Sequence, residues 1–146
     1  MGCDIHAIVE QQTDDEKWVT VNTLSHFVAQ RRKDAERDWA FPAALERNYR
    51  RFAALAGVRG NGPDPRGVPA DISETGCFRI AAWNGSAHSH SWLTIAEAAK
   101  VFAETEYWSA EEKNPQSFAR TFPACFFFGV ECEDIDKHRL VFWFSG

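Results

Sequence analysis

The chain has 146 residues, a net charge of −5 at pH 7 and a hydrophobic fraction of 45%. This length suffices for one domain whose core folds without metals or disulfides, and the composition argues against disorder. No apolar run approaches the roughly 20 residues of a membrane span, and the N-terminus has no secretory signal pattern. We therefore expect one soluble, cytoplasmic domain over residues 1–146 that binds no membrane.

The charge is distributed unevenly along the chain. Residues 31–66 carry a balance of +4, whereas the remainder carries −9. An acidic chain disfavours binding to a nucleic-acid polymer, because such affinity comes mainly from neutralising phosphates. A local cluster of arginines can nevertheless hold a small phosphate-bearing ligand.

The four cysteines do not indicate a metal site. They are Cys3, Cys77, Cys125 and Cys132, and no pair has the C-x2-C spacing of a zinc site. We expect free, mostly buried thiols in a reducing compartment.

The first predicted element is a β-hairpin. Residues 3–11 alternate with the period of a half-buried strand, which places Cys3, Ile5, Ala7 and Val9 on the core face. The polar residues 12–17 turn the chain, and residues 18–21 return as the second strand, with Trp18 expected in the core. Residues 24–41 are ambiguous between a charged helix and a loop.

A helix is predicted next, over residues 42–56. Pro42 occupies the first helical position, and Gly57 supplies the stop. Arg47, Arg50 and Arg51 form a stripe beside its apolar face. Residues 57–69 are rich in glycine and proline and predict a long irregular loop, a kind of segment that is often functional.

A second helix is predicted to begin near Thr94, which forms a capping box with Glu97. Residues 109–121 are expected to be a polar excursion. Two apolar strands, 125–131 and 139–144, then close the chain as a second hairpin. Together these elements predict an α+β fold: an antiparallel sheet from the N-terminal and C-terminal hairpins, with helices packed on it.

Two short histidine motifs suggest a metal site. Asp4-x-His6 lies on the first strand, and His88-x-His90 lies in the segment before the second helix. Each spacing aims two ligands to one side, so four ligands for a divalent metal would converge if the two segments meet. The alternative is that these are structural residues with satisfied hydrogen bonds.

The glycine-rich loop carries Arg59 and Arg66 and follows the arginine-bearing helix. Glycines let backbone N–H groups approach an anion, and guanidinium groups bind phosphate through two hydrogen bonds. Tyr49 and Trp92 are aromatic neighbours that could stack a base. The alternative is a surface loop whose arginines pair with nearby carboxylates.

Five segments resemble a family of small phage and prophage proteins that begin with MGCDIH. They are the opening MGCDIHAIVE, RNYRRFAALAGVRG, RGVPADIS, HSHSWLTIAE and the closing RLVFWF. The resemblance covers much of residues 1–97 and the last strand, but little of 23–41 and 98–122. It implies a phage context, with the host cell cytoplasm as location, and it draws attention to polar residues of the types that line ligand pockets. Those residues are Asp4, His6, Arg47, Asn48, Tyr49, Arg59, Arg66, Asp71, Ser73, His88, His90 and Trp92.

The leading functional expectation is binding of a small phosphorylated, nucleotide-like ligand by Arg47, Asn48, Tyr49, Arg59, Arg66, Asp71, Ser73 and Trp92. In a phage, such a protein could counter host nucleotide signalling by sequestration. The alternative is a metal-dependent or histidine-assisted phosphoesterase that uses Asp4, His6, His88 and His90. A structural or protein-interaction module is a third interpretation, and the sequence leaves a homo-oligomer open.

Overall fold

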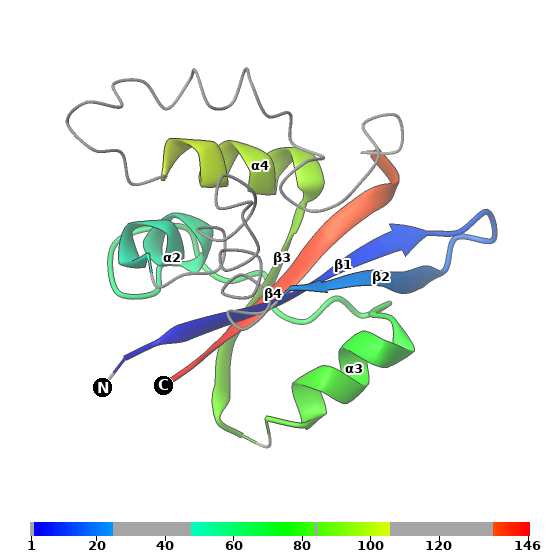
Figure 1. Cartoon of the computed structure of the whole chain (residues 1–146), viewed down its shortest axis with the longest axis horizontal. Helices are drawn as coiled ribbons and strands as arrows, with labels where there is room; N and C mark the ends of the chain where they lie inside the picture. Colours follow the sequence, from blue (N-terminus) through cyan, green and yellow to red (C-terminus); the bar gives the residue numbers. More distant parts are fainter. Residues whose placement is uncertain (1, 25–47, 84, 106–135) are drawn as a thin grey trace, which may run out of the picture.

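The computed structural model describes residues 2–24, 48–83, 85–105 and 136–146. Within these ranges four strands form an antiparallel sheet of order β2-β1-β4-β3 (Figure 1). The strands are β1 (Asp4–Gln12), β2 (Trp18–Leu24), β3 (Ala87–Thr94) and β4 (His138–Ser145).

In the same ranges, three helices pack against the sheet and complete the α+β fold, which confirms the predicted fold class. They are α2 (Tyr49–Ala56), α3 (Glu74–Ala81) and α4 (Ile95–Glu104). In Figure 1, α2 and α4 lie on one side of the sheet and α3 lies on the other. No helix in the described part of the chain is long and apolar enough to cross a bilayer.

Strand β1 contributes to a core on each face of the sheet. Cys3, Ile5, Ala7 and Val9 belong to the larger core under α2 and α4, as the alternation predicts. On the opposite face, Ile8 is fully buried in a smaller core formed with β4 and α3. The predicted hairpin is confirmed, because β1 and β2 pair antiparallel.

Strand β4 is an inner strand of the sheet. It pairs with β1 from Asp4↔Ser145 to Gln11↔His138, and with β3 on its other edge. The partners of the C-terminal strand therefore differ from the predicted hairpin, whose other strand, 125–131, lies outside the described residues. Residues 138–144 are all buried, which agrees with an inner position.

The segment around His88 is a strand, which was not predicted from the sequence. Strand β3 has a register shift between His88 and Ser91, and Ser89 adopts a positive φ of 55°. This irregularity is a β-bulge, which interrupts the alternation that reveals a strand in sequence. Gly67 donates its backbone N–H to the carbonyl of His90, so the 66–67 segment lies along the outer edge of β3.

Helix boundaries follow their caps. Helix α2 begins at Tyr49 rather than Pro42, because the backbone of Asn48 is extended and its side-chain oxygen accepts from the N–H of Arg51. It ends at Gly57, whose φ is 69°, as predicted. The predicted capping box of Thr94 is present at the start of α4. Helix α3, capped by Ser73, was not predicted.

Candidate functional site

The predicted metal ligands Asp4 and His6 do not converge with His88. His6 pairs across the sheet with Trp143, and His88 pairs with Phe144. Because consecutive residues of a strand point to opposite faces, the Asp4–His6 pair and His88 lie on opposite faces, with β4 between their strands.

His6 occupies an aromatic niche near the chain termini. Its ring lies 4.0 Å from that of Trp83 and 6.1 Å from that of Trp143. Its Nε2 atom is hydrogen-bonded to the Ser145 hydroxyl at 2.9 Å. Burial lowers the pKa of His6, against the opposing effect of the Asp4 charge. Burial therefore favours the neutral form of this ring.

His88 and His90 flank the positive-φ residue of the β3 bulge. The Nδ1 atom of His88 is hydrogen-bonded to Ser89 Oγ at 3.0 Å. The Nε2 atoms of both histidines are buried and have no hydrogen-bond partner within the described ranges. Burial lowers the pKa of His90, and the nearby charge of His88 lowers it further. Among the residues that the structure describes, no group of three or more His, Cys, Asp or Glu side chains is arranged to hold a metal.

The arginines of α2 do not form one exposed stripe. Arg51 is fully buried, where its Nε donates to Thr105 Oγ1 and an Nη donates to the Phe102 carbonyl. Arg50, in contrast, is exposed, and Arg47 lies outside the described residues. Asn48 is buried and donates to the Thr105 carbonyl at 2.6 Å. Asn48 and Arg51 therefore attach the start of α2 to the end of α4.

The glycine-rich loop packs onto the C-terminal end of α2. A Cβ atom at Gly62 would lie 1.7 Å from the carbonyl oxygen of Ala53, so this glycine is required by close backbone approach. Arg59 lies over the ring of Tyr49, whose hydroxyl accepts from the N–H of Cys3. The C-terminal end of a helix carries partial negative charge, which disfavours a phosphate there. The loop is therefore a poor anion cradle at this point.

Arg66 forms a bidentate ion pair with Glu97: its Nη1 donates to Oε1 at 3.0 Å and its Nη2 donates to Oε2 at 2.7 Å. This hydrogen-bonded pairing holds the pKa of Glu97 at about 2. The guanidinium also lies 5.0 Å from the ring of Trp92. Arg66 therefore anchors the loop to β3 and α4. It also lines a cavity of about 360 Å³ between α2, α4, β3 and this loop.

A larger cavity lies between the β1–β2 hairpin and the start of α3; we call it the hairpin pocket. It has a volume of about 510 Å³. Asp71 and Ser73, two of the predicted ligand residues, line it. The residues that line this pocket are Glu16, Lys17, Trp18, Val19, Thr20, Asp71, Ile72, Ser73, Glu74 and Thr75.

A buried polar network lies behind this pocket. Glu10, with no exposed surface, accepts from Arg139 Nε at 2.7 Å and from the backbone N–H of Ser73 at 2.7 Å. Arg139 also donates to Asp71 Oδ1 at 2.9 Å. Its guanidinium lies 4.0 Å from the ring of Trp18. Burial alone would raise the pKa of Asp71, but Arg139 outweighs this effect and lowers it.

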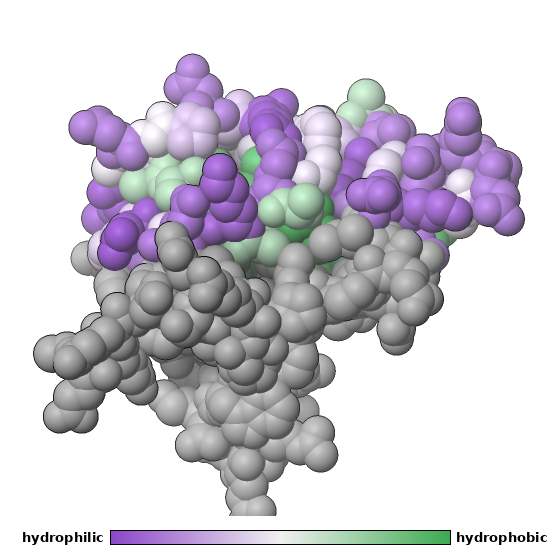
Figure 2. Space-filling model, turned by 90° about the horizontal axis from the view of Figure 1, so that it is seen from above, coloured by the Kyte–Doolittle hydropathy of each residue, from purple (hydrophilic) through white to green (hydrophobic). Residues whose placement is uncertain are grey.

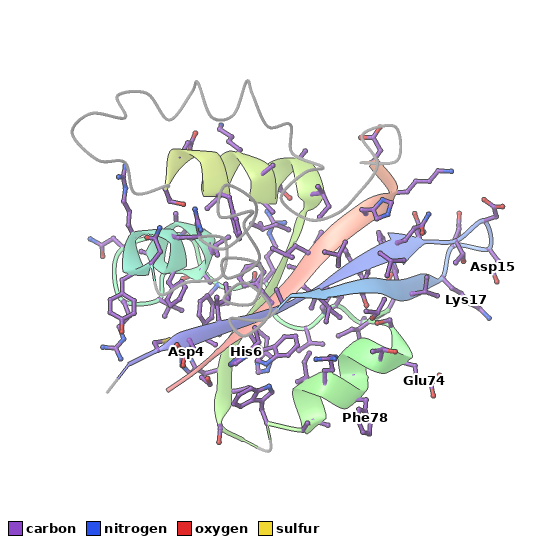
Figure 3. The ribbon with its side chains drawn as sticks, viewed as in Figure 1. Asp4, His6, Asp15, Lys17, Glu74 and Phe78 are labelled. Carbon is purple, nitrogen blue, oxygen red and sulfur yellow. The ribbon has the colours of Figure 1, made fainter. Side chains whose placement is uncertain are left out.

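The electrostatics of the hairpin pocket are mixed. The first turn of α3 has backbone N–H groups without a partner inside the helix, and Ser73 Oγ accepts the N–H of Gly76. Lys17 and Glu74 lie at the same end of the molecule, far from Asp4 and His6 (Figure 3). Figure 2 shows that this hairpin end is hydrophilic. One ammonium group and three carboxylates line the pocket, so its net charge is negative.

Two features of this site were not predicted from the sequence. Trp18 was expected in the core, yet it is only half buried and lines the pocket. The start of α3 has a local signal, since Ser73 followed by Glu74 suits a helix N-terminus. The pairing of Glu10 with Arg139 has no local signal, because the two residues are 129 positions apart.

Comparison with known proteins finds no match to this chain among protein-family models, curated proteins or solved structures.

Proposed function

We propose that the protein binds a small phosphorylated, nucleotide-like ligand in the hairpin pocket. One observation carries the proposal: the indole of Trp18 and the N-terminus of α3 line the same cavity of about 510 Å³. Pockets for small ligands and cofactors usually have volumes of about 300–1,000 Å³. An aromatic wall and a helix N-terminus are the two features that a base and a phosphate require.

The phosphate would lie at the start of α3. The backbone N–H groups of Glu74 and Thr75 belong to the first turn, where a helix attracts negative charge. Lys17 lies on the same pocket lining and supplies one positive charge. The hydroxyls of Thr20 and Ser73 are hydrogen-bonded to each other at 2.7 Å and add polar contacts.

The carboxylates suit the base better than the phosphate. Exocyclic amines and ring N–H groups of a base donate hydrogen bonds, and a carboxylate accepts them. Asp71 is partly neutralised by Arg139, whereas Glu16 and Glu74 are exposed at the pocket. These two side chains would repel a phosphate, and we expect them to limit affinity.

Sequestration of a signalling nucleotide would follow from the phage context that the sequence resemblance implies. A binding protein needs no catalytic group, so this proposal does not depend on convergence of Asp4, His6 and His88. The phosphoesterase interpretation remains an alternative for the same ligand, and analysis of products separates the two.

A protein-interaction module is a second candidate, favoured by one observation. Phe78 is 76% exposed on α3, and its side chain points away from the sheet (Figure 3). Among the large hydrophobic side chains in the described ranges, that of Phe78 is the most exposed. Binding of nucleotides would leave this side chain unexplained.

Calorimetric titration against adenosine and guanosine monophosphates and their cyclic dinucleotides tests the proposal. Lys17→Gln should weaken binding of the tightest ligand about tenfold, as expected for one charge-assisted contact. Glu74→Gln should strengthen it by removing repulsion. Lys100→Gln, on the other side of the sheet, is the matched control and should change nothing.

Two outcomes would contradict the proposal. The first is the lack of binding across the whole panel. The second is binding that responds equally to Lys17→Gln and Lys100→Gln. Chromatography of the titrated samples then detects any hydrolysis, which would favour the phosphoesterase.

A further inference from the structure

We propose that the buried ion pair of Glu10 and Arg139 positions the two walls of the hairpin pocket. A contribution to stability does not explain why the pair is present. This inference rests on the proposed function. The two residues line neither the pocket nor any predicted ligand site, yet they connect the two walls between which the ligand would lie.

Glu10 fixes the wall formed by α3. One of its carboxylate oxygens accepts the backbone N–H of Ser73, the residue that caps α3. The other oxygen accepts from Arg139 Nε at the same distance of 2.7 Å. Both oxygens of a side chain with no exposed surface are therefore occupied. The start of α3 is held on β1 through a charge-assisted hydrogen bond.

Arg139 fixes the opposite wall. Its guanidinium lies 4.0 Å from the ring of Trp18 on β2, which restrains the indole that would stack on the ligand. The same group donates to the carboxylate of Asp71 at 2.9 Å. Movement of this one side chain would change the positions of an aromatic and a carboxylate of the pocket together.

Stability alone gives no reason for the pair. Both side chains are desolvated, with exposed side-chain fractions of 0% for Glu10 and 6% for Arg139. Replacing a buried ion pair by apolar side chains of similar volume is often neutral or stabilising, because the desolvation cost disappears. The same face of the sheet already holds an apolar core that includes Ile8, Val141 and Trp143. Methionine in both positions would extend this core.

The double variant Glu10→Met/Arg139→Met tests the inference. We expect a Tm within a few degrees of the wild type, and at least tenfold weaker binding of the tightest nucleotide of the panel above. The ratio of the affinities for that nucleotide and for its nucleoside should also fall, because the α3 N-terminus loses its restraint. A purely structural role would not change this ratio. Glu10→Gln keeps an acceptor for Ser73 and should have an intermediate effect.

The control is Lys100→Gln on α4, on the other side of the sheet, which should leave nucleotide affinity unchanged. Three outcomes would overturn the inference. One is an unchanged nucleotide-to-nucleoside ratio in the Glu10→Met/Arg139→Met protein. Another is its unfolding, which would make the pair a stabilising element. The third is a wild type that binds no nucleotide, which alone would also end the proposed function.

Discussion

Replacing Gly62 by alanine should separate a structural role of the glycine-rich loop from a role in anion binding. The added Cβ would lie 1.7 Å from the carbonyl oxygen of Ala53 and 2.8 Å from its carbonyl carbon. These are backbone atoms, so no side-chain rotation can relieve the contact. The loop must move by more than about 1 Å, and overpacking of this kind costs about 1–3 kcal/mol or more.

The measurement is a thermal unfolding curve with a nucleotide titration beside it. In a chain of this length, each kcal/mol lowers Tm by about 2–4 °C. Gly62→Ala should therefore lower Tm by several degrees and leave nucleotide affinity unchanged. Asn61→Ala is the control, because the side chain of this neighbouring loop residue is exposed and its φ is not positive. An unchanged Tm with weaker nucleotide binding would refute the reasoning and restore the loop as an anion site.

Three further predictions concern buried and paired charges. Arg51→Met should lower the free energy of unfolding by about 2–3 kcal/mol in urea denaturation, because two buried acceptors lose a charged donor. Arg50→Met, at an exposed position, should change the free energy of unfolding by less than about 0.5 kcal/mol. Equal losses in the two variants would contradict this prediction. The Arg66–Glu97 pair should contribute about 0.5–1 kcal/mol above pH 4.5 and lose it as the pH falls towards 2, because pairing lowers the pKa of Glu97 from 4.5 to about 2. The difference in Tm between wild type and Arg66→Met should shrink over that range, and a constant difference would count against the pairing. Burial lowers the pKa of His6, so protonation below about pH 6.5 should destabilise the folded state. His6→Phe should therefore reduce the decrease of Tm between pH 7 and pH 5. An equal decrease in both proteins would show that folding does not change the pKa of His6.

Local features of the sequence determined the elements that depend on neighbouring residues. The alternation of Cys3, Ile5, Ala7 and Val9 predicts β1 and its core face, because successive side chains of a strand point to opposite sides. The capping box of Thr94 predicts the start of α4, and Gly57 predicts the end of α2. Each signal spans only a few residues, which is why it can be recognised without knowledge of the fold.

Tertiary structure alone decided the position of β4 and the identity of the pocket. An apolar strand fits the centre of a sheet or one arm of a hairpin equally well, and its partners here come from β1 and β3. A local pattern likewise does not reveal which polar residues are buried. Arg51 and Arg50 are adjacent in sequence, yet one is buried against α4 and the other is exposed. Glu10 meets Arg139 across 129 positions, and the guanidinium of Arg139 also lies over the ring of Trp18. Burial and long-range pairing are properties of the whole chain packing at once, so no local pattern contains them.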